Sequence, residues 1–257
     1  LMEHIAETVM VDGNLEAVML NQNPQTCEIC GKPYILKQYS RFRVYVPDCK
    51  CRENQEKREA EIKERAKKRA ELKRRYKDAG FPYDTRGKRL KTRTCEHTDT
   101  AWEYIKKFQP KKRQGLYFVG KVGNGKTTLA VCIGKELILK GYKVKFVGFS
   151  QAIRILQSTY GTKNPLEFME QVREFAKYDL LIFDDFGREA YKDRTLTDVA
   201  DFVNHIYSEQ TNVIITSNPE MVEKIKQIPD FEAMFDRFFQ MTKRKNFTRP
   251  SYRRIDG

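Results

Sequence analysis

The sequence has little of what a membrane or secreted protein needs. It holds a single Trp, its mean hydropathy is −0.70, and no apolar run approaches the ~20 residues that a membrane span requires. The stretch from Leu1 to Val11 carries acidic side chains and neither Lys nor Arg, so it lacks the basic start of a secretion signal. We therefore expect a cytoplasmic protein without a membrane partner.

Acidic residues are also scarce relative to basic ones. The 257 residues include 49 Lys and Arg against 35 Asp and Glu, which gives a formal net charge of +14. A balance of this kind favours polyanionic partners such as nucleic acid. The length is enough for one full α/β domain and a small additional module.

The segment from Gly120 to Thr127, GKVGNGKT, fits the phosphate-loop pattern G-x-x-x-x-G-K-[ST] at every position. A strand-like run precedes it (Leu116 to Val119) and a helix-like run follows (Thr128 to Leu139). In that context the glycines let backbone N–H groups close around phosphates, and the helix N-terminus adds positive charge. The pattern predicts an ATP or GTP site with Lys126 at the β- and γ-phosphates and Thr127 on Mg²⁺. The predicted nucleotide contacts are Gly120, Gly123, Asn124, Gly125, Lys126, Thr127 and Thr128.

A second acidic element completes such a site. Four apolar residues, Leu180 to Phe183, run directly into Asp184 and Asp185, which is typical of a buried parallel strand. Two adjacent carboxylates at the end of a buried strand are costly without a cation. We expect Asp184 to hold Mg²⁺, directly or through water, and Asp185 to polarise the attacking water; the alternative is a strand that ends in a solvated acidic turn.

Two further features are weak evidence for a nucleotide site when taken singly, but their order along the chain is informative. A third strand-like run, Val213 to Ser217, ends in Asn218, which could touch the γ-phosphate or the attacking water or simply begin a turn before Pro219. A short helix from Phe231 to Phe238 carries Arg237, which by itself would be a surface ion-pair residue. The order of phosphate loop, acidic strand end, Asn strand end and Arg resembles the AAA+ ATPases.

The resemblance narrows to the DnaC/DnaI family of replicative helicase loaders, to which the IstB transposition ATPases are related. It covers the chain from about Phe81 to the C-terminus and rests on GLYFVG at 115–120, DLLIFDDFG at 179–187, Thr216-Ser217-Asn218, Met234 to Arg237, and Ser251-Tyr252-Arg253.

The resemblance implies an AAA+ fold, ATP hydrolysis and a role for each element. Asn218 would be the residue that senses the γ-phosphate, and Arg237 would complete the site of a neighbouring subunit. Asp185 departs from the Glu that most AAA+ proteins carry, although this family often has Asp there. Only twenty residues follow Arg237, too few for a separate helical lid, so Arg253 is the candidate for the cation that a lid would supply.

Two close cysteine pairs mark a separate N-terminal module. Cys27 and Cys30 are followed, after eighteen residues, by Cys49 and Cys51, and Phe42, Val44 and Val46 alternate with polar residues as in a half-buried strand. A module this small usually needs a metal or disulfides. In a cytoplasmic chain the four cysteines favour a tetrahedral Zn²⁺ site over disulfides or free thiols, although the second pair is C-x-C.

The segment between the cysteines and the phosphate loop begins with a long charged stretch. Residues 52–77 are rich in Glu, Lys, Arg and Ala and contain neither Gly nor Pro, which predicts one solvated helix. The pairs Glu59/Lys63, Glu61/Arg65 and Glu64/Lys68 have the favourable i,i+4 order. The helix is either a spacer or a docking element for a partner protein.

The remaining pattern alternates strands and helices, which predicts a parallel sheet covered on both faces. A helix pair before the acidic strand matches in position the insert with which initiator-type AAA+ proteins contact DNA. Tyr160 at this helix pair, together with aromatic and cationic side chains that follow the acidic strand, could bind single-stranded DNA, although each one alone could be plain surface. They are Tyr160, Arg188, Tyr191, Lys192 and Arg194.

The interpretation is an ATP-controlled helicase loader with a zinc module at 1–51, a helical linker at 52–79 and an AAA+ domain at 80–257. Its expected cofactors are ATP, Mg²⁺ and Zn²⁺, and its partners are the hexameric replicative helicase, single-stranded DNA and further copies of itself. An IstB-like transposition helper is the alternative, and the zinc module speaks against it because the resemblance places such modules with DnaI-type loaders. A small-molecule kinase would need a substrate lid, and a zinc-finger transcription factor would need base-reading helices.

Overall fold

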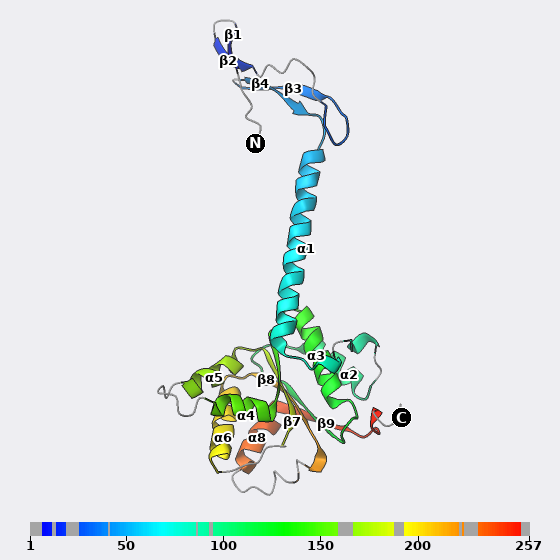
Figure 1. Ribbon diagram of the computed structural model, residues 1–257, viewed down its shortest axis with the longest axis vertical. Coiled ribbons are helices and arrows are strands. Elements are labelled where there is room, and N and C mark those ends of the chain that lie inside the picture. The colour runs from blue at the N-terminus through cyan, green and yellow to red at the C-terminus, as the bar shows by residue number, and fades with distance from the viewer. Residues whose placement is uncertain are drawn as a thin grey trace. The chain divides into compact units, whose positions relative to one another are not determined.

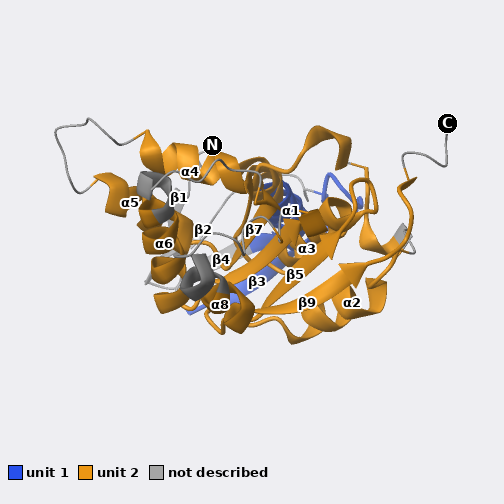
Figure 2. Cartoon of the chain, turned by 90° about the horizontal axis from the view of Figure 1, so that it is seen from below, with its two compact units in different colours: residues 1–69 blue, residues 70–257 orange. Residues whose placement is uncertain are grey.

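A computed structural model describes residues 7–11, 14–18, 26–40, 42–85, 87–92, 95–158, 167–187, 193–220, 223 and 231–252 (Figure 1). The chain divides into two compact units, residues 1–69 and residues 70–257, coloured separately in Figure 2. Within the described ranges, no helix is both long and apolar enough to cross a bilayer.

The N-terminal unit contains a four-stranded sheet of order β1-β2-β4-β3. Its strands are β1 (Glu7–Val11), β2 (Asn14–Val18), β3 (Tyr34–Tyr39) and β4 (Phe42–Pro47). The alternating pattern of Phe42, Val44 and Val46 correctly predicts β4. The other three strands were not expected, because their sequences lack a comparable alternation between turn residues.

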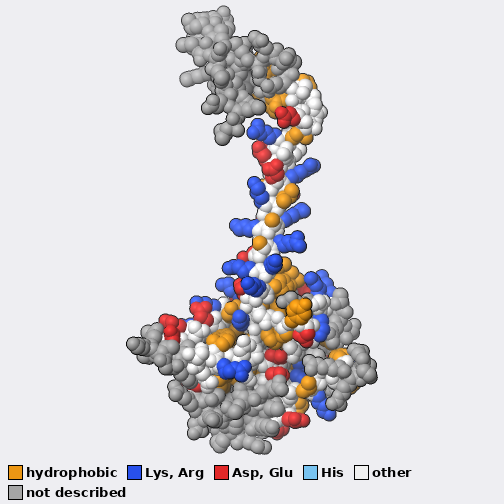
Figure 3. All heavy atoms as spheres, in the orientation of Figure 1, with side chains coloured by type: hydrophobic (Ala, Val, Ile, Leu, Met, Phe, Trp, Pro, Cys, Tyr) orange, Lys and Arg blue, Asp and Glu red, His pale blue; other side chains and the backbone are white. Residues whose placement is uncertain are grey.

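Helix α1 (Cys51–Ala79) confirms the helix predicted for the charged stretch. Figure 3 shows charged side chains standing out along it, and most of its residues are exposed. Among the three i,i+4 pairs that favour this helix, Glu64 and Lys68 lie at ion-pair distance, 2.6 Å. Exposed ion pairs stabilise a helix little, because holding two long side chains in one geometry costs entropy.

The second unit is built on a five-stranded sheet of order β6-β7-β8-β5-β9, in which every neighbouring pair is parallel. The acidic strand is separated from the phosphate-loop strand by the Asn strand, so all three end at the same edge. The strands are β5 (Gly115–Gly120), β6 (Val144–Gly148), β7 (Leu180–Phe186), β8 (Asn212–Ser217) and β9 (Thr242–Phe247).

Helices cover both faces of this sheet, as the alternating pattern predicts (Figure 2). One buried cluster joins β7 and β8 to α4, α5, α6 and α8, and the other joins the sheet to α2, α3 and the end of α1. The helices are α2 (Thr98–Lys107), α3 (Lys126–Leu139), α4 (Phe149–Gln157), α5 (Glu167–Ala176), α6 (Asp193–Ser208) and α8 (Phe231–Met241), with 3-10 turns at Tyr83–Thr85 and Leu90–Thr92.

The packing explains which strands the sequence reveals. Leu180 to Phe183 are fully buried, and each large apolar side chain contributes roughly 1.5–3 kcal/mol by leaving water. Strand β9 reads TKRKNF and is an edge strand, so it needs little apolar sequence and was not predicted. Helix α2 was also missed, because it is short and amphipathic in a polar stretch.

Candidate nucleotide site

The predicted nucleotide residues meet at the carboxyl edge of the sheet, where β5, β7 and β8 end. Of the described ones, all except Gly120 and Arg237 line a cavity of about 420 Å³, a volume within the usual range of small-molecule sites. The lining residues are Pro82, Asp84, Thr85, Lys88, Val122, Gly123, Asn124, Gly125, Lys126, Thr127, Thr128, Asp184, Asp185, Asn218 and Tyr252.

The phosphate loop depends on glycine at three positions. Gly123 (φ 83°) and Gly125 (φ 97°) adopt left-handed backbone conformations that other residues rarely take. A side chain on Gly120 would place its Cβ 2.6 Å from the carbonyl oxygen of Phe247 at the end of β9, which is too close for any residue other than glycine. Helix α3 begins at Lys126 directly after the loop, so its N-terminal N–H groups are directed at the cavity.

Lys126 is held inside the phosphate loop by oxygen acceptors. Its side chain is 5% exposed, and its Nζ donates to the carbonyls of Gly120 (2.6 Å) and Lys121 (2.8 Å) and more weakly to the amide oxygens of Asn124 (3.2 Å) and Asn218 (3.3 Å). Burial lowers the pKa of Lys126 to about 8, although the nearby Asp185 and Asp184 oppose the shift. An anionic phosphate would place negative charge next to this ammonium, whose hydrogen-bond acceptors are neutral oxygens.

Asp184 lies at the centre of an oxygen cluster. Its Oδ1 accepts hydrogen bonds from the hydroxyls of Thr127 (2.7 Å) and Thr216 (2.6 Å). Burial raises the pKa of Asp184, and these two hydrogen bonds act in the opposite direction. A Thr hydroxyl and a carboxylate side by side are hard oxygen ligands of the kind that Mg²⁺ binds beside phosphates, so the residues fit the ion.

Asp185 has an unusual backbone. It adopts φ 54° at an irregularity in β7 between Phe183 and Phe186, and its N–H donates to the hydroxyl of Thr216 at 3.1 Å. Positive φ is uncommon for residues other than Gly, although Asp and Asn tolerate it best. Such outliers cluster at functional sites, where the surroundings hold them in place.

Arg237 is not among the residues that line this cavity. It is half-buried on α8, does not line the site, and forms no ion pair with any described residue. Arg253, Tyr160, Arg188, Tyr191 and Lys192 fall outside the described residues, and for Arg194 only its place in α6 is described. The structure therefore brings the phosphate loop, Asp184, Asp185 and Asn218 together around the cavity, and Arg237 is not part of its lining.

One side of the cavity is formed by residues that the sequence did not identify. Pro82, Asp84, Thr85 and Lys88 belong to the segment that leads into the domain. Lys135 on α3 fixes this segment, since its buried ammonium donates to the carbonyls of Thr85 and Lys88. Burial lowers the pKa of Lys135.

A second addition is the segment 248–252 after β9, which we call the C-terminal strap. Tyr252 donates its N–H to the carbonyl of Gly123 at 3.0 Å, and its ring lies beside Gly125. Glu96 anchors the strap by accepting from the N–H of Thr248 (3.0 Å), its hydroxyl (2.8 Å) and the N–H of Arg249 (3.2 Å). Burial would raise the pKa of Glu96, but the hydrogen bonds from Thr248 and Arg249 outweigh it and lower the pKa.

The four predicted metal ligands also meet, in the N-terminal unit. The sulfur atoms of Cys27, Cys30, Cys49 and Cys51 all lie within 4.8 Å of one another. Four sulfurs bound to one Zn²⁺ at about 2.3 Å would be roughly 3.8 Å apart, so the cluster fits a tetrahedral ion after a small contraction. Gly31 (φ 70°) makes the turn after the first pair and donates to the carbonyl of Cys27 at 2.7 Å.

Comparison with known proteins identifies the group. Residues 53–256 match the family of IstB-like ATP-binding proteins. The chain belongs to this family. An ATP-binding protein of insertion sequence IS5376 from Geobacillus stearothermophilus is 29% identical over 145 residues, which are 55% of this chain and 56% of that protein. The chromosomal replication initiator protein DnaA of Enterococcus faecalis is 30% identical over 116 residues, or 44% of this chain and 25% of that protein.

Solved structures give the fold of this IstB-like chain. The DnaC helicase loader superposes with a TM-score of 0.56 at 20% identity, covering 65% of this chain and 100% of that one. DnaI superposes with a TM-score of 0.54 at 18% identity, covering 66% and 95%. The expected AAA+ fold is confirmed, and the chain is an IstB-like ATP-binding protein with this fold. This chain spans about half the length of the first curated relative named above and a quarter of the second.

Proposed function

We propose that this protein is an ATP-dependent loader that binds a hexameric replicative DNA helicase and delivers it onto single-stranded DNA. The observation that carries the proposal is the four-cysteine module. It precedes the segment that matches the family, residues 53–256, and therefore adds a separate part to an ATPase of the DnaC fold.

In this proposal the cavity binds ATP and acts as a switch. Lys126 leaves its carbonyl acceptors and donates to the phosphates, while the loop N–H groups and the start of α3 hold the remaining charge. Thr127 and Asp184 hold Mg²⁺, which neutralises charge on the phosphates. Asp185 orients the attacking water, and Asn218, already 3.3 Å from Lys126, contacts the γ-phosphate.

Arg237 acts on the site of a neighbouring subunit. It does not line its own cavity and forms no ion pair with any described residue, which leaves the guanidinium available for that role. Such an in-trans cation is worth roughly 10³–10⁵ in turnover where hydrolysis is efficient. Hydrolysis would therefore depend on self-assembly.

The N-terminal module holds one Zn²⁺ through its four cysteines and docks on the helicase. Zinc would cross-link the two cysteine pairs and so stabilise this small unit. Tyr160, Arg188, Tyr191, Lys192, Arg194 and Arg253 keep their predicted roles at DNA and nucleotide.

A transposition helper is the second candidate, and a specific observation favours it. The matched family is the IstB-like one, and ATP-binding proteins of insertion sequences are among the relatives near 29% identity. In that case the cysteine module would dock on a transposase.

A co-purification experiment tests the proposal. The full chain and a tagged replicative helicase should elute together, with one Zn²⁺ per chain by metal analysis. Replacing Cys27 and Cys30 by Ser should release the helicase while ATP affinity stays near wild type. The matched control is Cys132→Ser, a buried cysteine outside the cluster. Absence of zinc, or capture of a transposase in place of the helicase, would overturn the assignment.

A further inference from the structure

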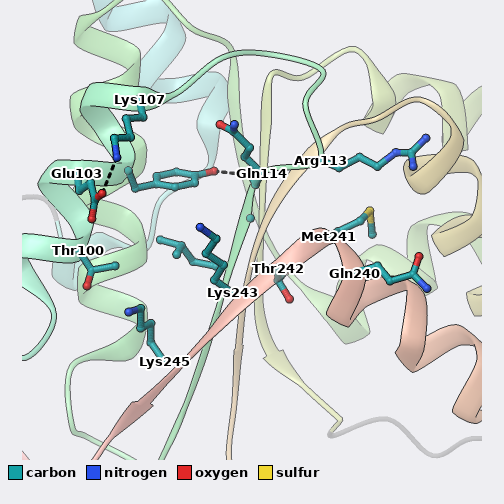
Figure 4. A pocket seen from close by; sticks show the side chains of 13 residues that line it. Thr100, Glu103, Lys107, Arg113, Gln114, Gln240, Met241, Thr242, Lys243 and Lys245 are labelled. Atoms are coloured by element: carbon teal, nitrogen blue, oxygen red, sulfur yellow. Dashed lines mark hydrogen bonds and ion pairs between the residues drawn. The ribbon is translucent and has the colours of Figure 1, made fainter.

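A second cavity of about 400 Å³ lies at the opposite edge of the same sheet, where β5 and β9 begin (Figure 4). Helix α2 forms one wall and β9 the other. We call one part of its wall the basic groove, which consists of Thr100, Glu103, Lys107, Gln114, Lys243 and Lys245.

Cations dominate the basic groove. Lys243 and Lys245 are two residues apart on β9, so both side chains lie on the face of the strand that looks toward α2. Neither forms a hydrogen bond or ion pair with another described residue. Lys107 is the third ammonium, paired with Glu103 at 2.7 Å.

The only carboxylate of the basic groove does not neutralise it. The hydrogen bond from Lys107 lowers the pKa of Glu103 most, and the charges of Lys243 and Lys245 lower it further, so all three ammonium groups lie near this carboxylate. The groove keeps a net charge of +2 from these four side chains. Arg113 lies farther along the cavity wall and does not add to this cluster, because its guanidinium stacks on Tyr207, 4.2 Å from the ring centroid.

We propose that the basic groove binds the phosphate backbone of a nucleic acid. Paired lysines on one strand face suit a ligand with repeated negative charges, and the hydroxyl of Thr100 and the amide of Gln114 can donate to phosphate oxygens. The formal charge of +14 favours the same class of partner. The proposal adds a contact to the DNA binding in the proposed function but does not depend on helicase loading or on ATP.

These lysines have a possible second role, which the experiment must distinguish from nucleic-acid binding. Lysines on an edge strand also prevent sheets from pairing edge to edge. β9 is such an edge, so Lys243 and Lys245 could serve solubility alone. In that case their loss would cause association of the protein and leave nucleic-acid binding unchanged.

The experiment compares the full chain with a Lys243→Gln/Lys245→Gln variant. Affinity for a fluorescent single-stranded oligonucleotide and for a duplex of the same sequence is measured from about 0.05 to 0.3 M salt. Loss of two phosphate contacts should flatten the logarithmic salt slope by about 1.4 for the single strand or 1.8 for the duplex. Affinity should fall about tenfold or more near 0.1 M salt. The ligand is single-stranded or double-stranded nucleic acid according to which oligonucleotide loses affinity for the variant.

Arg244→Gln is the matched control, because Arg244 is an exposed cation on β9 that does not line the cavity. ATP affinity and light scattering are followed for every variant to report folding and association. The proposal stands if only the double lysine variant loses affinity and salt slope. It is overturned if this variant binds both forms like Arg244→Gln, if it only associates, if the wild-type chain binds neither form, or if an acidic polyglutamate peptide competes as well as the oligonucleotide.

Discussion

At the scale of single residues, Lys126 is the most informative side chain. It is buried, and its ammonium is bound by neutral oxygens that a phosphate would replace. Its lowered pKa follows from that burial, which the nearby Asp185 and Asp184 only partly offset. Sequence alone predicted the residue and its partner phosphates, because the loop pattern is local.

Nucleotide binding should therefore take up protons at alkaline pH. The pKa of Lys126 is about 8 in the folded protein and 10.5 ordinarily, so the ligand-free protein binds fewer protons here than the unfolded chain between these values. The destabilising effect of this residue is present below pH 8 and disappears as the pH rises toward 10.5. Bound phosphate restores the charge, so calorimetry near pH 8 in buffers of different ionisation heat should show uptake of about half a proton per ATP.

The matching variants isolate this residue. Lys126→Ala should abolish ATP binding, while Lys121→Ala, an exposed lysine of the same loop, should bind normally and take up the same fraction of a proton. Equal ATP affinity of Lys126→Ala and wild type would refute the assignment of the phosphate loop.

At the scale of elements, sequence and structure agree where a pattern is local. The phosphate loop, the acidic strand, the Asn strand and helix α1 each carry their signal in consecutive residues, and all were predicted. Strand β9, helix α2 and the strap were not, because their roles depend on contacts between distant parts of the chain. Glu96 and Thr248 are separated by 152 positions, and neither residue has a sequence signal that points to the other.

The strap yields a prediction at this scale. Glu96→Gln should keep the size of the side chain but weaken the charge-assisted hydrogen bonds to Thr248 and Arg249, each worth roughly 1.5–3 kcal/mol when intact. Tyr252 would then hold the phosphate loop less firmly, and ATP affinity should fall about tenfold, or ~1.4 kcal/mol. Titration with a fluorescent ATP analogue measures the loss.

A control separates the strap from general surface charge. Glu174→Gln removes an exposed carboxylate that pairs with Lys177, and neither residue lines the cavity. This variant should leave ATP affinity unchanged. If Glu96→Gln binds ATP as well as Glu174→Gln does, the strap has no part in the nucleotide site.

At the scale of the whole molecule, the ATP site is expected to be complete only between subunits. Arg237→Ala should bind ATP normally yet lose the ATPase activity that depends on assembly or DNA. An Arg237→Ala subunit still offers a sound phosphate loop, and a Lys126→Ala subunit still offers Arg237. Mixing the two inactive proteins should therefore restore part of the activity, measured as phosphate release, and a mixture that assembles but stays inactive would contradict the in-trans role.

The central claim, ATP-dependent helicase loading, is tested most directly on circular single-stranded DNA. A circle has no ends, so a helicase ring can enclose it only if the ring is opened or assembled around it. We predict that helicase remains on the circle after a salt wash when the wild-type protein and ATP are present, and that none remains with Lys126→Ala or with the Cys27→Ser/Cys30→Ser variant. Equal retention of helicase with and without this protein would contradict the account.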